Sequence, residues 1–120
     1  MAFLNSYKDL IVWQKSIDLV LEIYKLTELF PKSELYGLSS QMRRSSVSIS
    51  SNIAEGSRRG TRKEYRRFLE IAFGSGAELE TQIYISKKLE TVKDYNYQKV
   101  DCLLDESMRI LNVLITKLKG

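Results

Sequence analysis

Apolar residues recur along the chain at spacings of three and four positions, which is the period of an amphipathic α-helix. No stretch alternates apolar and polar residues for long enough to predict a β-strand. We therefore predict four helices, over residues 7–29, 33–59, 61–90 and 96–119. Thr61 and Glu64 have the spacing of an N-terminal capping box, and Gly60 stands where a helix would end. The turn between the middle two helices is therefore expected to be tight.

Each predicted helix has one apolar face that would meet a common core. The faces consist of Leu10, Trp13, Ile17, Val20 and Tyr24 in the first helix; Leu35, Leu38, Met42, Ile49 and Ile53 in the second; Tyr65, Phe68, Ala72, Leu79 and Ile83 in the third; and Tyr97, Val100, Leu104, Ser107, Leu111, Leu114 and Leu118 in the fourth. Short connections make neighbouring helices run in opposite directions. The sequence thus predicts an all-α fold, an antiparallel up-down-up-down four-helix bundle, formed by a single domain over residues 1–120.

The apolar faces of the first and fourth helices are wider than one core requires, because further apolar positions lie beside each face. Soluble monomers seldom expose a continuous apolar band of that size, so we predict an interface between copies of the chain in a homo-oligomer. Its residues would be Val12, Leu19, Ile23, Leu26, Leu103, Ile110 and Ile115. The alternative is that neighbouring helices of the same chain cover both flanks.

Small residues predict close contact between the second and third helices. Seven serines fall within residues 39–51, and glycine, alanine and serine fill residues 74–77. Counted outward from Gly60, residue 45 lies level with residue 75, so the two small-residue stretches would oppose each other and let the backbones approach. The same counting places Arg43 and Arg44 near Glu78 and Glu80, which predicts ion pairs between these helices.

The composition narrows the class of function. The 120 residues include no histidine and one cysteine, Cys102. The absence of histidine excludes His-based metal sites and His-assisted nucleophiles, and it leaves the serines without an activating base. We expect no catalytic residues, no metal and no cofactor, so the protein would not be an enzyme. No apolar run approaches the ~20 residues of a membrane span, and a single cysteine makes no intrachain disulfide, so we expect a cytoplasmic protein that does not bind membranes.

Positive charge is concentrated in one segment of the chain. The net charge is +4, yet residues 58–67 alone hold six basic residues against one acid. The six are Arg58, Arg59, Arg62, Lys63, Arg66 and Arg67. Cations in the first turn of a helix oppose the helix dipole, so they are not placed for stability, whereas guanidinium groups beside free backbone N–H groups suit phosphate. The alternative is a solvated charge run, partly neutralised by Glu55 and Glu70 at helical spacing.

Tyr65 lies inside this basic stretch, and its position allows two interpretations of its role. Its ring would be available to stack on a base or an arginine if it faced solvent. It also falls on the apolar face of the third helix, and we favour packing in the core.

Three strings of the sequence resemble a known family. They are LIVWQKS at 10–16, FPKSELYGLSSQMRRSSVSISSNIAEGSRRG at 30–60 and FLEIAFGSGAELETQIYIS at 68–86. They resemble the bacterial four-helix-bundle proteins encoded in intervening sequences of 23S ribosomal RNA genes. Two positions depart from the family pattern: Ser50 stands where the family has proline, and Gly76 where it has a larger apolar residue. The resemblance implies a four-helix bundle assembled as a homo-oligomer, a five-membered ring, in the bacterial cytoplasm.

Two functions follow as competing hypotheses. The first is a non-catalytic homo-oligomer that binds the backbone of RNA or DNA through the basic turn. The resemblance favours this hypothesis by analogy, because relatives that accompany diversity-generating reverse transcriptases are thought to bind nucleic acid through a basic surface of the ring. The second is a structural adaptor that binds a protein partner through its apolar helix faces and has no role with nucleic acid.

Overall fold

Four long helices and the short turns between them make up residues 6–119, the part of the chain that the computed structural model describes. The helices are α1 (Ile11–Glu28), α2 (Ser40–Ser57), α3 (Arg62–Ser86) and α4 (Gln98–Lys119). The short helical turns are η1 (Tyr7–Asp9), η2 (Lys32–Glu34) and η3 (Leu35–Ser39). Residues 6–119 contain no strand, so the predicted all-α class is confirmed. Residues 1–5 and 120 of the single domain predicted over 1–120 lie outside the described part.

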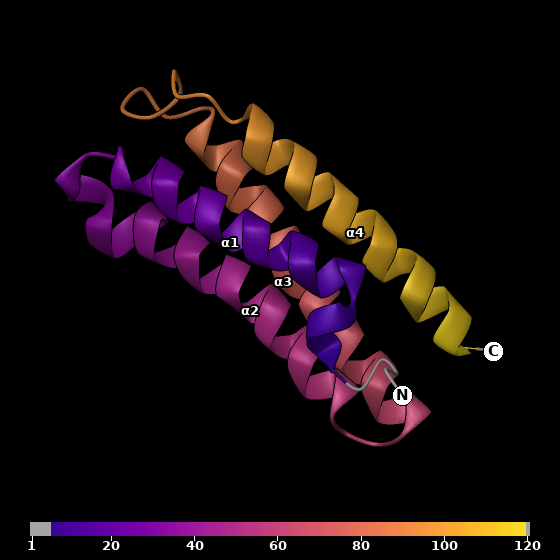
Figure 1. The fold of residues 1–120 in the computed structure, drawn as a ribbon. Helices are drawn as coiled ribbons and strands as arrows, with labels where there is room; N and C mark the ends of the chain where they lie inside the picture. The colour runs from indigo at the N-terminus through magenta and orange to yellow at the C-terminus, as the bar shows by residue number, and fades with distance from the viewer. Residues whose placement is uncertain (1–5, 120) are drawn as a thin grey trace.

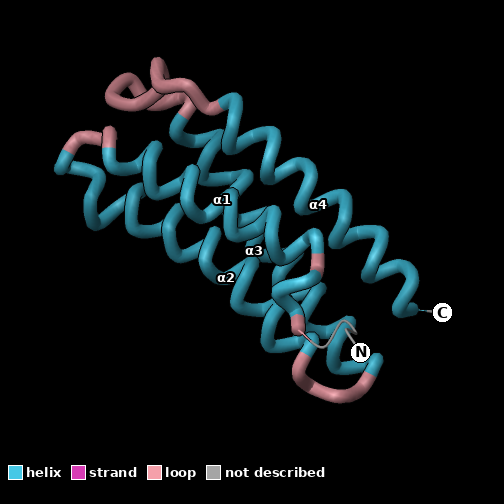
Figure 2. Tube along the Cα trace, viewed as in Figure 1, coloured by secondary structure: helices cyan, strands magenta, loops and turns pink. Residues whose placement is uncertain are grey.

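The helices lie side by side in an elongated molecule of 49 × 27 × 23 Å (Figure 1). α1 packs on α2 and α4, and α3 packs on the same two helices. The start of α1, the turn between α2 and α3 and the end of α4 all lie at one end of the molecule (Figures 1 and 2). The other connections lie at the opposite end. None of the helices in the described part combines the length and the hydropathy that a membrane crossing needs.

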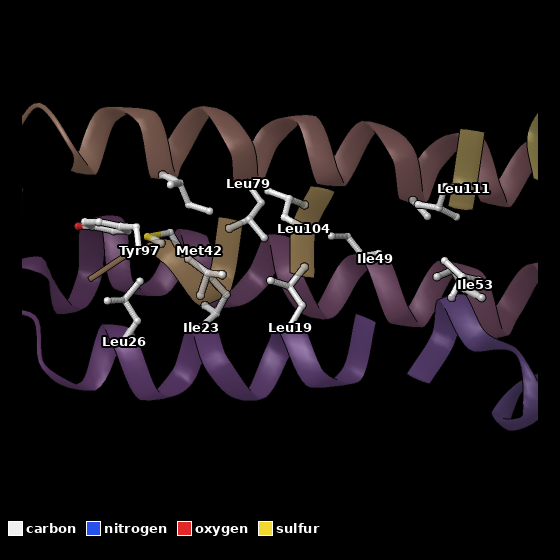
Figure 3. Close-up of a cluster of buried hydrophobic side chains, with 14 of the residues drawn as sticks. Leu19, Ile23, Leu26, Met42, Ile49, Ile53, Leu79, Tyr97, Leu104 and Leu111 are labelled. Carbon is white, nitrogen blue, oxygen red and sulfur yellow. The ribbon is translucent and has the colours of Figure 1, made fainter. Parts of the chain in front are cut away.

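The core runs between the four helices, and its side chains point toward one another from all of them (Figure 3). Met42, Ile49 and Ile53 of α2 are fully buried, as are Leu79 of α3 and Leu111 of α4. The faces predicted for the second, third and fourth helices therefore meet the core. The exceptions are Leu35, which is 45% exposed, and Tyr65, Leu114 and Leu118, which are half-buried at the margin.

The face of α1 that meets the core is not the predicted one. The buried residues are Val12, Ser16, Leu19, Ile23 and Leu26, whereas Leu10, Trp13, Ile17 and Val20 are half-buried and Tyr24 is exposed. Both sets repeat at the helical period, so hydropathy alone does not separate them. The buried face includes a serine, and Ser16 is buried at little cost because it donates its hydroxyl to the carbonyl of Trp13, 2.6 Å away.

Most of the predicted interface between copies belongs to the core of a single chain. Val12, Leu19, Ile23, Leu26 and Ile115 are buried by their own neighbouring helices, so the prediction that they face another copy is wrong. Leu103 and Ile110 are half-buried and pack against the same core. The wide apolar face of α1 is explained by two neighbours, α2 and α4, that cover its flanks. Other apolar side chains remain in contact with solvent, including Leu21 and Val113, which are 55% and 51% exposed.

The second helix begins later than predicted. The backbone leaves helical geometry at Gly37, where φ is −110° and ψ is −112°, and α2 starts at Ser40 instead of residue 33. Pro31 and the turns η2 and η3 fill the intervening chain. The carboxylate of Glu34 accepts a hydrogen bond from the backbone N–H of Leu38 at 3.4 Å, which caps the irregular turn. Tyr36 is left pointing into solvent.

The end of the molecule opposite the α2–α3 turn is closed by the long connection between α3 and α4. Because α3 ends at Ser86, the segment from 87 to 97 is a loop instead of the helical end predicted at residue 90. Tyr95 donates its hydroxyl to the carbonyl of Leu29, 2.6 Å away, and stacks on Phe30 at 5.4 Å between ring centroids. Tyr97 donates to the carbonyl of Val92 at 2.7 Å, which fixes the loop over the core.

The small residues of α3 face two different helices. The hydroxyls of Ser48 and Ser75 lie 2.9 Å apart, so part of the predicted contact between α2 and α3 is present. Gly76 faces α4 instead, where a Cβ atom would collide with the sulfur of Met108. Gly74 has open space around it. The glycines therefore do not share one close contact, because successive helical positions are 100° apart around the axis.

Candidate nucleic-acid interface

A tight turn brings the ends of α2 and α3 together with their cations. Gly60 adopts a left-handed conformation, with φ at +87°, which reverses the chain directly after α2. The side chain of Thr61 then accepts a hydrogen bond from the backbone N–H of Glu64 at 3.1 Å and so caps α3. The predicted cap and turn are both present. Arg58 and Arg59 thus stand at one side of the turn, beside the first two turns of α3.

The two helices touch closely next to this turn because α2 carries a glycine there. A Cβ on Gly56 would lie 2.7 Å from the Cβ of Phe68 and 3.2 Å from the ring of Tyr65. Only hydrogen fits in that space. Tyr65 is half-buried and packs against the core, as we favoured from the sequence.

Three of the six cations form ion pairs. Arg59 lies 2.6 Å from Glu55, Arg67 lies 3.1 Å from Glu64, and Arg66 lies 4.0 Å from Glu70. Glu55 and Glu70 therefore each pair with an arginine within helical reach, as their spacing predicted. All three pairs are at least partly exposed to solvent, so each contributes little to stability. Their effect is to orient the guanidinium groups along the surface.

Aromatic rings support three of the positive charges at this end. The guanidiniums of Arg59 and Arg67 both lie over the ring of Phe68, 4.7 Å and 4.5 Å from its centroid. Arg58 lies 5.3 Å from the ring centroid of Tyr7, in the turn before α1. Such contacts hold cations against the protein without neutralising them. The sequence did not predict these two contacts, because it indicated only a core position for Phe68 and the start of a helix for Tyr7.

Arg62 joins the start of α3 to the end of α4. Its guanidinium donates a hydrogen bond to the carbonyl oxygen of Lys117, 2.7 Å away. The last carbonyls of a helix carry partial negative charge, so this contact satisfies an otherwise free acceptor. It also places Lys117 and Lys119, the two lysines in the last turn of α4, at the same end as the turn. We call Arg58, Arg59, Arg62, Lys63, Arg66, Arg67, Lys117 and Lys119 the basic end.

The basic end keeps a surplus of positive charge after its ion pairs are counted. Within residues 55–70, six cations face three carboxylates, and Lys117 and Lys119 add to the difference. Lys63 is exposed and has no ion pair or hydrogen bond within the described residues. The sequence pointed to the first six residues only. The two lysines of α4 were overlooked. In an antiparallel four-helix bundle the fourth helix ends beside the turn between the second and third helices, so the predicted topology would have placed these lysines at the basic end.

The local field affects one carboxyl group at the basic end. A hydrogen bond from Arg67, reinforced by the charges of Arg67, Arg59 and Lys63, lowers the pKa of the Glu64 carboxyl below its usual value. The same pairing raises the pKa of the Arg67 guanidinium. Glu64 is therefore a fixed negative charge at neutral pH, and it interrupts the positive surface between Lys63 and Arg67.

The predicted ion pairs between α2 and α3 are not present. Arg43 faces α1, where its Nε donates to the hydroxyl of Thr27 at 2.8 Å, and Arg44 is exposed. Glu78 accepts a hydrogen bond from Ser45 at 3.3 Å, and Glu80 is exposed. No ion pair within residues 6–119 involves these four residues. Counting from the turn placed residue 45 level with residue 75, whereas Ser45 contacts Glu78 and Ser48 contacts Ser75. Counting also does not say which way each side chain leaves its helix.

Comparisons with known proteins come from a family model and a solved structure. The model of the 23S rRNA-intervening sequence proteins matches residues 8–113. A crystal structure of a protein with unknown function from the S23 ribosomal protein family of Bacteroides thetaiotaomicron is similar in fold, with a TM-score of 0.72 and 24% identity. That similarity covers 92% of this chain and 100% of the other. No curated protein matches the sequence.

Proposed function

The chain belongs to the family of 23S rRNA-intervening sequence proteins, and on that basis we propose that it is a non-catalytic homo-oligomer that binds the backbone of RNA or DNA through its basic end. The observation that carries the proposal is the charge at this end. Cations from the turn after α2, from the start of α3 and from the last turn of α4 converge there, and the carboxylates beside them are too few to neutralise them.

The positions of these cations support phosphate as the ligand. Arg62 and Lys63 open α3, where the free backbone N–H groups and the helix dipole already attract anions. Arg62 with Arg66, and Lys63 with Arg67, are like-charged pairs one helical turn apart, each unfavourable by about 0.2 to 0.5 kcal/mol. A bound phosphate relieves that repulsion. The proposed contact is with phosphate groups, and contacts with phosphate carry no information about the base sequence.

Fluorescence anisotropy with a labelled hairpin RNA tests the proposal. The logarithm of the binding constant should fall linearly with the logarithm of salt concentration, with a slope of about −0.9 for each phosphate contacted. The test variant changes Arg62, Lys63, Arg66 and Arg67 to glutamine. The matched control removes the same charge elsewhere, by changing Lys25, Lys32, Lys88 and Lys93 to glutamine.

The expected result is a large loss of affinity and a shallower salt slope for the test variant, with little change for the control. Because Arg62 and Arg66 also make contacts within the chain, Lys63→Gln alone is a second variant that leaves the fold untouched, and it should reduce the slope by about one contact. Equal losses in test and control variants, or no binding at low salt, would overturn the proposal.

Self-association would place several basic ends on one assembly and strengthen binding through avidity. We infer a homo-oligomer, and the family resemblance implies a five-membered ring. Exposed apolar side chains such as Ile11, Leu21 and Val113 support a contact between copies. The mass of the protein in solution tests this, because a monomeric mass at micromolar concentration is incompatible with it.

We also infer that the bundle has the antiparallel up-down-up-down arrangement. Two hydrogen bonds support it: Arg62 at the start of α3 reaches Lys117 near the end of α4, and Tyr95 in the α3–α4 loop reaches Leu29 just after α1. The proposed setting is the bacterial cytoplasm, which holds the nucleic acid and in which a single cysteine, Cys102, stays reduced.

A structural adaptor is the second candidate, and the same exposed apolar residues favour it. Such a protein would bind a protein partner through its helix faces and use the basic end only as surface. Pull-downs performed with and without nuclease distinguish the two functions. A partner that survives nuclease treatment favours the adaptor, and one that is lost favours nucleic-acid binding.

A further inference from the structure

A groove on the exposed face of α2 brings two tyrosines and two arginines together. Tyr24 comes from α1, Tyr36 from η3, and Arg43 and Arg44 from α2. The groove has a volume of about 640 Å³ and is open to solvent. No carboxylate is among the residues that line it. We call this feature the α2 groove.

Arg43 is anchored at the edge of the α2 groove by a network that begins in the core. Its Nε donates to the hydroxyl of Thr27 at 2.8 Å, and that buried hydroxyl donates in turn to the carbonyl of Ile23 at 2.7 Å. The guanidinium lies over the ring of Tyr24, 4.7 Å from the centroid. Within residues 6–119, the two Nη groups of Arg43 have no hydrogen-bond partner. A rigid cation with free donors is suited to binding an anion, because little entropy is lost on contact.

Tyr36 and Arg44 are open to solvent in the same groove. Tyr36 is 92% exposed, the highest value among the exposed large apolar and aromatic side chains of the described residues. An aromatic ring this exposed presents a whole face for stacking. Arg44 has no ion pair or hydrogen bond in the described part of the chain. Ser40 adds a hydroxyl, and Leu35 and Val47 add apolar surface, so the groove offers both an aromatic face and charge.

We propose that the α2 groove binds one nucleotide of single-stranded RNA or DNA, with the base stacked on Tyr36 and the neighbouring phosphate held by Arg43 and Arg44. An exposed aromatic ring beside guanidinium groups is the combination that recognises an unpaired base and its backbone. A duplex does not bind in the α2 groove, because its bases stack on one another and offer no free face to Tyr36. The inference rests on the proposed function and extends it, since it specifies an unpaired strand.

The α2 groove and the basic end lie along one helix. From Arg44 to Arg58 there are fourteen residues, which at 1.5 Å each is about 21 Å. Arg58 directly follows the last residue of α2. Because fourteen residues are two heptads and the drift is roughly 20° per heptad, Arg58 leaves the end of the helix near the side on which Arg44 lies. A strand whose phosphates contact the basic end can therefore continue along α2 to the groove.

The experiment compares a labelled single strand of about 12 nucleotides with a duplex of the same length, by anisotropy at fixed salt. Tyr36→Ala removes the stacking face, Tyr36→Phe keeps it, and Arg44→Gln removes one phosphate contact. Tyr84→Ala is the matched control, because Tyr84 is an exposed tyrosine on α3, away from the groove. A single strand that carries 5-bromouridine also allows light-induced crosslinks to be mapped by peptide mass.

Tyr36→Ala should lower affinity for the single strand at least fivefold, which corresponds to about 1 kcal/mol for one stacked base, and leave affinity for the duplex unchanged. Tyr36→Phe and Tyr84→Ala should bind like the parent. Arg44→Gln should weaken single-strand binding and reduce the salt slope. Crosslinks should map to the segment from 24 to 48.

Three results would overturn the inference. The first is that Tyr36→Ala binds the single strand like the parent. The second is that Tyr36→Ala loses equal affinity for the single strand and the duplex. The third is that Tyr36→Ala changes the mass of the assembly in solution, which would identify the groove as a contact between copies. Failure of the proposed function looks different. In that case the glutamine variant of the basic end binds like the parent, while Tyr36→Ala still loses the single strand.

Discussion

Arg62, the first residue of α3, donates a hydrogen bond from its guanidinium to the carbonyl oxygen of Lys117, two residues before the end of α4. The two residues are 55 positions apart in the sequence. This bond joins a positive group to the negative end of a helix dipole, so it stabilises the last turn of α4.

Replacing Arg62 with glutamine should loosen the end of α4. We expect a loss of about 0.5 to 1.5 kcal/mol in the free energy of unfolding, the usual net contribution of one hydrogen bond. Amide hydrogen exchange should become faster in the last turn of α4 and stay unchanged in its first turns. Lys63→Gln is the control, because it removes the same charge from a neighbouring position that has no partner in the described structure.

Two glycine substitutions should have opposite effects on stability. Gly56→Ala adds a Cβ only 2.7 Å from the Cβ of Phe68, so it should destabilise the protein by about 1 to 3 kcal/mol. Gly74→Ala adds a Cβ in open space on a helix and should stabilise it by about 0.5 to 1 kcal/mol. Urea unfolding midpoints measure both changes. A destabilised Gly74→Ala variant would contradict this account of α3.

Removing a buried hydroxyl from α4 should stabilise the core. Ser107 is fully buried, and its Oγ has no hydrogen-bond partner among residues 6–119. Ser107→Ala removes that unsatisfied group and should raise the free energy of unfolding by about 1 kcal/mol. Ser16→Ala is the comparison, because the hydroxyl of Ser16 is bonded to Trp13 and its loss should not stabilise. Thermal unfolding of the two variants tests the difference.

Stability should fall in alkaline solution through Tyr97. Burial raises the pKa of the Tyr97 phenol above its usual value of 10.0, and the phenol donates to the carbonyl of Val92. The folded state therefore favours the protonated form. Its contribution is fully present below pH 10 and is lost as the pH rises through the raised pKa.

Unfolding midpoints measured from pH 7 to above pH 10 check this dependence. Tyr97→Phe should make the loss of stability at alkaline pH less steep. Burial also raises the pKa of the Tyr65 phenol, so Tyr65 accounts for a further part of that loss.

Helix positions followed from the sequence wherever a local signal fixed them. Thr61 with Glu64 placed the start of α3, and Gly60 placed the turn before it, because caps and left-handed residues act through the nearest few bonds. The core face of α4 also followed from its regular apolar spacing. In contrast, the apolar residues of α1 fit two faces equally well, and the choice between them depends on how α2 and α4 pack around the helix.

The candidate site was predicted in part for the same reason. The cations within residues 58–67 are close in sequence, so one turn of chain brings them together. Lys117 and Tyr7 reach the same end only through tertiary structure. The α2 groove gave no sequence signal, because Arg43 was assigned to an ion pair with α3 and Tyr36 lay in a segment predicted to be regular helix.

Phe68 carries two guanidiniums on one ring, one from Arg59 after α2 and one from Arg67 on α3. A single side chain thereby sets the separation of two positive charges, one in the turn after α2 and one on α3. Without the ring, the two long arginine side chains would become ordered only on binding a polyanion, and that ordering costs conformational entropy. Here the spacing exists beforehand, so the aromatic ring acts as a template whose loss would cost binding without removing any charge.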